Sequence, residues 1–157
     1  MTWQEVINHP SLQDLPFKIE LNAAGVIEMS PITNMRGRLM AELSVALPTH
    51  FSHGKVSLNS GIQTSDGLRV ADVVWMTTSF FQDNKHQIYW KAAPSICVEI
   101  SDSCTGVAIQ HKTKLYLEAG AKEVWLCDLE GKLRFYNENG QLERSNLASA
   151  FPKEISL

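Results

Sequence analysis

Two segments of this sequence combine a nearly continuous apolar run with a single carboxylate. Asp72 opens the run DVVWM, and Glu99 lies inside the run ICVEI. Runs without polar alternation are typical of strands that are covered on both faces of a sheet. A carboxylate in such a strand is costly to bury unless something pairs with it, and a bound metal ion is a natural partner. Both acids are therefore candidate functional residues, although they could also be strand-end residues paired with Arg69 or Lys91.

The first half of the sequence predicts a hairpin, a helix and then strands. Alternating residues on either side of an Asn-Ala-Ala-Gly turn predict a β-hairpin over 18–28. Apolar residues at near-helical spacing predict an amphipathic helix over 34–49, with Thr33 or Asn34 as its N-cap. Further strands are expected at 55–63, 69–76, 95–101, 123–128 and 132–136.

A second helix is expected over 107–119, ending at Gly120, because glycine suits the left-handed C-cap position. This helix carries Lys112, thirteen residues after Glu99, and should pack behind the strand of that acid. The tail through Pro152 is expected to lie on the surface. Strands and helices in this order predict one α/β domain over all 157 residues, with a mixed central sheet flanked by helices.

Composition and charge bound the class of protein. No apolar run approaches the length of a membrane span, and the N-terminal residues lack the basic and apolar regions of a signal peptide. Cys97, Cys104 and Cys127 show no CxxC spacing and are expected to be reduced core thiols of a cytoplasmic protein. The net charge of −3 argues against constitutive nucleic-acid binding, yet residues 29–116 hold eight basic and six acidic residues. That local excess fits either a phosphate-facing surface or a scattered solvated face.

Four motifs carry a resemblance to a known family. They are MSP at 29–31, RVADV at 69–73, VEISDSCT at 98–105 and KTKLYLEAGAKEVWLCD at 112–128. With these motifs in this order, residues 15–136 resemble the Uma-two family of restriction-endonuclease-like proteins, within the PD-(D/E)xK nuclease superfamily. The resemblance implies a restriction-endonuclease-like core, DNA as the substrate, and hydrolysis of its phosphodiester bonds.

The resemblance also implies a role for each site residue. Asp72 and Glu99 match the two acidic positions of the family and would be catalytic ligands of a divalent metal, together with the backbone carbonyl of Ile100. Hard oxygen ligands of this kind suit Mg²⁺ or Mn²⁺. Lys112 matches the helix lysine of the family and would polarise the attacking water or stabilise the charged phosphate. Glu42 on the first helix could supply an outer-shell acid.

The chain departs from the family pattern around these residues. Ala71 stands where a proline usually precedes the first acid, and Ser101 stands where many nucleases of the superfamily have a lysine. The segment 102–104 adds a carboxylate, and Met35-Arg36 replaces an Arg-His pair. The altered segment 102–104, together with the low net basicity of the chain, favours two alternatives to an active endonuclease. One is a catalytically degenerate fold that binds nucleic acid or protein, and the other is an inert subunit of a defence or mobile-element system.

A short apolar cluster, Ile88-Tyr89-Trp90, interrupts an otherwise polar loop. It could be a contact between two copies of the chain, or it could fold over the core. Related nucleases often act as dimers so that both DNA strands are cut. A homodimer is therefore expected, with this cluster as its nominated contact.

Overall fold

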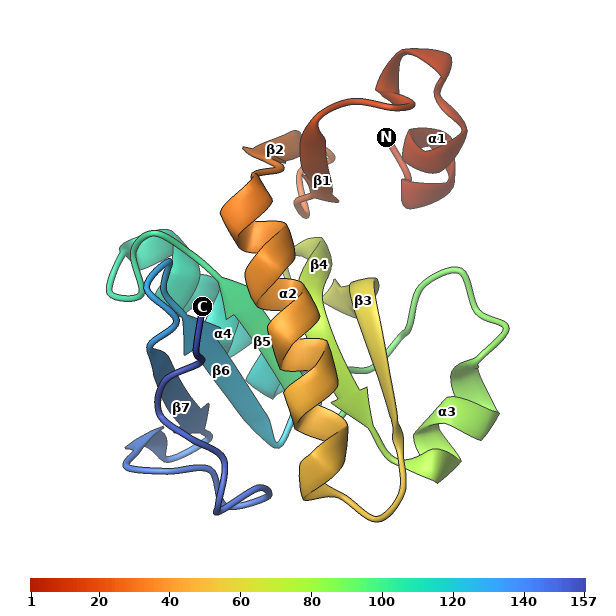
Figure 1. Ribbon diagram of the computed structural model, residues 1–157. Helices are drawn as coiled ribbons and strands as arrows, with labels where there is room; N and C mark the ends of the chain where they lie inside the picture. Colours follow the sequence, from red (N-terminus) through yellow and green to blue (C-terminus); the bar gives the residue numbers. More distant parts are fainter.

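One mixed sheet forms the centre of the structure, with helices on both of its faces (Figure 1). The computed structural model describes residues 1–157. Its strands are β1 (Phe17–Leu21), β2 (Ile27–Pro31), β3 (Lys55–Thr64), β4 (Gly67–Met76), β5 (Ile96–Ile100), β6 (Glu123–Cys127), β7 (Leu133–Asn137) and β8 (Gly140–Leu142). They follow the order β2-β1-β4-β5-β6-β7-β8, and β3 pairs with β4 off this path. The predicted α/β fold with a mixed sheet is confirmed.

The helices are α1 (Trp3–Asn8), α2 (Asn34–Ala46), α3 (Thr78–Asn84) and α4 (Val107–Glu118). Strands β5 and β6 are parallel neighbours, because the chain returns between them through α4. Figure 1 shows α2 crossing one face of the sheet and α4 lying on the other. Leu43 of α2 shares an apolar cluster with Val73, whereas Tyr116 of α4 shares a second cluster with Val74. Successive residues of β4 therefore point to opposite faces, as the geometry of a strand requires.

The predicted hairpin, strands and second helix are all present, but the first helix is shorter than expected. It ends at Ala46 and continues as a 3₁₀ turn over Leu47–His50. Pro48 lacks the N–H group that would continue the helical hydrogen-bond ladder. Thr33 is the N-cap, since its hydroxyl accepts a hydrogen bond from the Arg36 N–H at 3.3 Å. This cap fixes the position of the Arg36 backbone in the first turn of α2.

Besides a 3₁₀ turn at Pro10–Leu12, three short elements were not expected from the sequence. They are α1 with six residues, α3 with seven and β8 with three. The two helices have two turns or fewer, and the strand has only three residues. Hydrophobic periodicity needs a longer window to become recognisable, so the sequence pattern does not distinguish these segments from loops.

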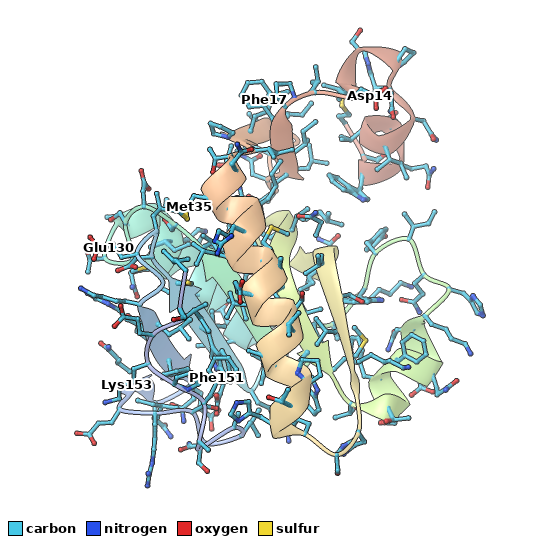
Figure 2. The ribbon with its side chains drawn as sticks, in the orientation of Figure 1. Asp14, Phe17, Met35, Glu130, Phe151 and Lys153 are labelled. Carbon is cyan, nitrogen blue, oxygen red and sulfur yellow. The ribbon has the colours of Figure 1, made fainter.

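The expectation that the C-terminal tail lies on the surface was wrong. Ala148, Phe151 and Ile155 are buried in the same apolar cluster as the inner face of α2. The Phe151 ring lies against Trp125 of β6, with 4.7 Å between ring centroids. Figure 2 shows Phe151 on the inner side of the C-terminal segment and Lys153 on its outer side. The tail has neither helical nor strand periodicity, so its buried residues could not be recognised from spacing.

A buried carboxylate, Glu123, fastens this tail to the sheet. Its Oε1 accepts hydrogen bonds from Trp125 Nε1 at 2.9 Å and from Ser145 Oγ at 2.6 Å. Its Oε2 accepts from the backbone N–H groups of Asn146 at 2.8 Å and Leu147 at 3.0 Å. Both oxygens are satisfied, which is what a buried acid requires.

The three cysteines are buried free thiols, as expected, and two of them lie on strands β5 and β6. Burial raises the pKa of the Cys97 thiol well above its ordinary value and that of Cys127 to about 12. These thiols are therefore protonated near neutral pH and chemically quiet. No helix of the structure combines the length and apolarity needed to cross a membrane.

The Ile88-Tyr89-Trp90 cluster divides between the two expected alternatives. The backbone N–H of Trp90 donates to the Gly61 carbonyl at 2.9 Å. The Trp90 ring lies edge-on to Phe80, with 5.3 Å between ring centroids. Trp90 therefore folds over the core beside β3. Ile88 stays 64% exposed. A surface for a second copy of the chain remains a prediction.

Candidate active site

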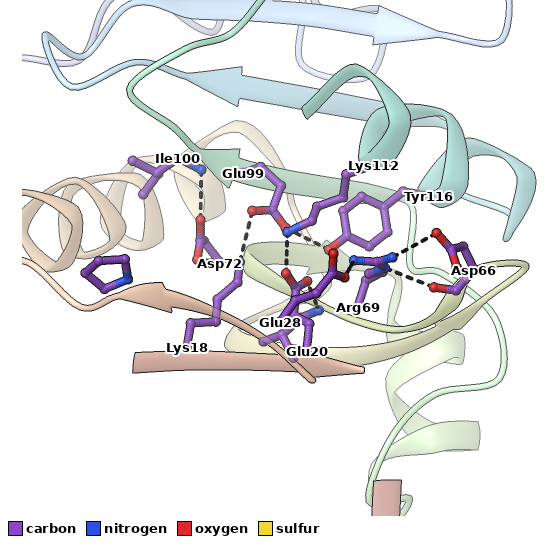
Figure 3. Close-up of polar contacts among 12 residues, drawn as sticks. Lys18, Glu20, Glu28, Asp66, Arg69, Asp72, Glu99, Ile100, Lys112 and Tyr116 are labelled. Carbon is purple, nitrogen blue, oxygen red and sulfur yellow. Dashed lines mark hydrogen bonds and ion pairs between the residues drawn. The ribbon is translucent and has the colours of Figure 1, made fainter. Parts of the chain in front are cut away.

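Asp72 and Glu99 lie side by side on neighbouring antiparallel strands. The register pairs Val73 of β4 with Val98 of β5, so the two acids are adjacent just beyond this pair. Their side chains converge on one cation. The Lys18 Nζ on β1 lies 3.2 Å from Asp72 Oδ1 and 3.0 Å from Glu99 Oε2. The two candidate carboxylates therefore share a face of the sheet and a common point (Figure 3).

Asp72 is fully buried, and both of its oxygens accept hydrogen bonds. Oδ1 accepts from Lys18 and from Arg36, whose Nη2 and Nε lie at 2.6 and 3.1 Å. Oδ2 accepts from the Ile100 backbone N–H at 2.8 Å. Burial and the nearby Glu99 charge raise the pKa of Asp72, while Lys18 and Arg36 act in the opposite direction. Asp72 is thus held rigidly from three sides.

Glu99 is the more strongly ionised of the two acids. Its Oε1 accepts a hydrogen bond from Tyr116 Oη at 2.7 Å and lies 3.6 Å from Lys112 Nζ. Burial alone would raise the pKa of Glu99, but Lys112 and Lys18 lower it to about 2. For Lys18, burial works against the charged form, yet Glu99 and Asp72 keep its pKa above the ordinary lysine value. Glu99, Lys18 and Lys112 therefore form an array of opposite charges that stabilise one another.

Glu20 on β1 completes this array and was not recognised in the sequence. Its Oε1 accepts from Lys112 Nζ at 2.7 Å, and its Oε2 accepts from the Val70 N–H at 2.7 Å. Lys112 therefore bridges Glu20 and Glu99, and its helix is packed as expected. Three acids and three cations balance one another in a small volume. They are Glu20, Asp72, Glu99, Lys18, Arg36 and Lys112.

Two sequence signals could have revealed the missing residues. Lys18 and Glu20 are two apart in a strand, so both point to the same face of the hairpin. Tyr116 follows Lys112 by four positions, so the two lie on the same face of α4. Tyr116 is fully buried, as is usual for an aromatic residue on the inner face of a helix. Its hydroxyl gives it the second role of orienting Glu99.

The charged array opens into a cleft of about 550 Å³ between the hairpin, α2 and α4. Its rim carries a second set of ion pairs. Arg69 pairs with Glu28 and with Asp66, the latter at 3.0 Å, and Asp66 also contacts His111 Nε2 at 3.0 Å. The guanidinium of Arg69 therefore pairs with acids of the rim and not with Asp72 or Glu99. The structural alternative in which Arg69 pairs with the candidate acids was wrong, and Lys91 does not pair with them either.

Comparison with protein families decides where the chain belongs. A model of the Uma2 family, described as "Putative restriction endonuclease", matches residues 3–156. The chain belongs to the Uma2 family. This confirms the resemblance seen in the sequence motifs. Among curated proteins, none matches.

The fold of this Uma2 protein has a solved counterpart. The crystal structure of "a putative nuclease belonging to DUF820" from Anabaena variabilis ATCC 29413 matches with a TM-score of 0.67. The two sequences are 15% identical, and the match covers 83% of each chain. At this level of identity the likeness establishes the fold. The Uma2 chain therefore has the fold of a protein described as a nuclease.

The oxygen donors of the Uma2 site are of the type that small hard cations bind. Asp72 and Glu99 offer two carboxylates, and Mg²⁺ is commonly bound by one or two carboxylates with waters completing its shell. Ile100 lines the cleft beside them, whereas Glu42 lies outside the lining and makes no ion pair. No group of three or more His, Cys, Asp and Glu side chains is arranged to hold a metal ion. The point between the two carboxylates is taken by Lys18.

Proposed function

We propose that this Uma2 protein is a metal-dependent endonuclease that hydrolyses phosphodiester bonds in DNA. One observation carries the proposal: Asp72 and Glu99 converge on neighbouring strands, and Glu99 lies beside the Lys112 ammonium in the lining of a cleft. Paired carboxylates suit Mg²⁺ or Mn²⁺, and a lysine beside them suits a reaction that builds negative charge on a phosphate. The description of the family supports the same reaction class.

In this proposal Asp72 and Glu99 would hold the metal ion, with the Ile100 carbonyl as a further oxygen ligand. When bound, Mg²⁺ or Mn²⁺ supplies a water of lowered pKa and offsets charge on the scissile phosphate. The Ile100 N–H keeps Asp72 in a single orientation, and Tyr116 does the same for Glu99. Ligands fixed in this way need little reorganisation when substrate arrives.

Lys112 would act on the phosphate. Its ammonium has three N–H donors, and Glu20 engages the group at 2.7 Å. Glu20 thus holds Lys112 at the cleft without occupying all of its donors. A phosphate oxygen entering the cleft could accept from the remaining N–H groups. Lys112 would then stabilise the charge that grows on the phosphate in the transition state.

A second candidate function is binding of nucleic acid or protein without cleavage. The observation that favours it is the saturation of Asp72, whose oxygens accept from Lys18, Arg36 and the Ile100 N–H. A carboxylate with so many internal partners can be a purely structural acid. Such a module would bind its partner equally well with and without divalent ions.

Nicking of supercoiled plasmid DNA separates the two functions. We expect conversion to open-circular and linear forms in Mg²⁺ or Mn²⁺, and none after addition of a chelator. The controls are protein-free DNA with each metal and chelated protein to which excess Mn²⁺ is restored. Plasmid that stays supercoiled at equimolar protein and millimolar Mn²⁺, while a gel-shift assay shows DNA binding, would favour the second candidate.

We also propose that the protein acts as a homodimer, because one cleft can engage one DNA strand at a time. Exposed Ile88 beside half-buried Trp90 is the surface nominated for the contact. A stable dimer should bury about 1,200 Å² or more in total. Sedimentation equilibrium is expected to give twice the chain mass of 17.6 kDa. Monomers at micromolar concentration, with Ile88→Asp behaving identically, would contradict the proposal.

A further inference from the structure

Lys18 holds a special position among the three cations of the site. Arg36 contacts Asp72 alone of the paired acids, and Lys112 approaches Glu99 alone. The Lys18 ammonium contacts both, at 3.2 and 3.0 Å, and its side chain is only 6% exposed. Lys18 therefore stands where one cation satisfies both carboxylates at once.

A metal ion held by the same two carboxylates would need that position. Mg²⁺ binds oxygen at about 2.0–2.1 Å, roughly an ångström closer than the Lys18 ammonium lies from either acid. An ion drawn in by Asp72 Oδ1 and Glu99 Oε2 would collide with Lys18 Nζ or face its charge at contact distance. The ammonium and the ion cannot share the space, and their mutual repulsion is strong in a poorly hydrated site.

We infer that Lys18 and a divalent cation compete for one position between Asp72 and Glu99, so that metal binding requires the Lys18 side chain to swing into the cleft. This inference deepens the proposed function and rests on it. In the metal-free protein Lys18 neutralises the paired acids and keeps the site assembled. Its departure would make room for the ion and bring an ammonium to the cleft, where phosphate is expected.

The surroundings of Lys18 allow such a movement. Lys18 is one of the residues that line the cleft, so the cleft offers space next to this residue. All five residues of its strand, β1, pair with β2, whereas the strand pairing between β1 and β4 is limited to Leu21 and Leu68. The other lysine is less free to leave, because Glu20 holds Lys112 at 2.7 Å from outside the paired acids.

Calorimetric titration of Mn²⁺ into DNA-free protein tests the competition. Lys18→Met and Lys18→Gln are expected to bind Mn²⁺ at least about tenfold more tightly than the unaltered protein, because a buried positive charge beside both ligands is gone. Lys114→Met is the matched control, since Lys114 is 74% exposed on α4 and meets only Glu118 at 3.8 Å. This control should bind Mn²⁺ like the unaltered protein.

The outcomes distinguish this inference from the proposed function. Mn²⁺ binding that is equal or weaker in both Lys18 variants would overturn the competition and leave the endonuclease proposal standing. Tighter binding with no plasmid nicking in any protein would support the competition and overturn the nuclease. No Mn²⁺ binding in any variant overturns both. Should the variants unfold without metal, a cooperative thermal transition restored by Mn²⁺ supports competition, and its absence at saturating Mn²⁺ overturns it.

Discussion

Asp72→Asn and Glu99→Gln should each lose Mn²⁺ binding and reduce plasmid nicking to the level of chelated protein. Each change removes one of two anionic oxygen donors that converge on the same point. Mutating groups that merely support metal ligands commonly costs about 10–100-fold in affinity, so loss of a ligand itself should exceed that range. Calorimetric Mn²⁺ titration and nicking rates, measured on the same preparations, give both quantities.

Stability must be followed in the same variants, because the acids also balance buried cations. Removing one partner of a buried ion pair typically costs about 3–5 kcal/mol, although an amide retains part of the hydrogen bonding. Thermal unfolding therefore establishes that each variant is folded at the assay temperature. Glu130→Gln is the matched control, since Glu130 is 76% exposed and pairs only with Lys132 at 3.2 Å. Unchanged Mn²⁺ affinity in both site variants would show that these acids are structural.

Lys112→Met should behave differently, with Mn²⁺ binding retained and the cleavage rate lowered by roughly 10²–10³-fold. Loss of one electrostatic donor to the transition state has about this effect in other enzymes. Metal affinity should be equal or slightly higher, because a positive charge 3.6 Å from Glu99 has been removed. Cleavage rates at saturating Mn²⁺ isolate the chemical effect from any change in binding.

Two further variants help to interpret a lower cleavage rate in Lys112→Met. Lys114→Met on the same helix should cleave normally, because its ammonium faces solvent. Glu20→Gln should lower the rate less than Lys112→Met, since it loosens the lysine without removing it. A parallel fall of Mn²⁺ affinity and cleavage rate in Lys112→Met would contradict the assignment and show that Lys112 mainly maintains the geometry of Glu99.

The two acids could be singled out from the sequence because the residues that surround each of them in the chain are apolar. Asp72 and Glu99 each interrupt a run of apolar residues, and a charged group in such a run stands out. The helix of Lys112 was equally clear from its spacing and its glycine stop. The succession of the longer strands and helices along the chain was also predicted from local patterns, and this succession indicated a mixed sheet.

The remaining members of the site depend on how distant segments meet. Lys18 and Glu20 belong to an alternating hairpin, which by itself predicts one face toward solvent. Only the placement of β1 beside β4 buries that face and turns two ordinary polar residues into partners of the candidate acids. Arg36 is likewise an unremarkable first-turn residue of α2 until the helix is set against Asp72. Contacts of this kind have no periodic signal.

The Glu123 anchor has a practical bearing on how this protein can be handled. Leu157 is exposed, so a tag or carrier domain can be appended beyond it without entering the core. Removal of Ser145 and all residues after it is another matter, because it takes Phe151 and Ile155 out of the cluster shared with α2. It would also leave a buried carboxylate without most of its donors, on the strand next to the one that bears Glu99. Shortened versions would report on a damaged sheet and could be mistaken for catalytically inert protein.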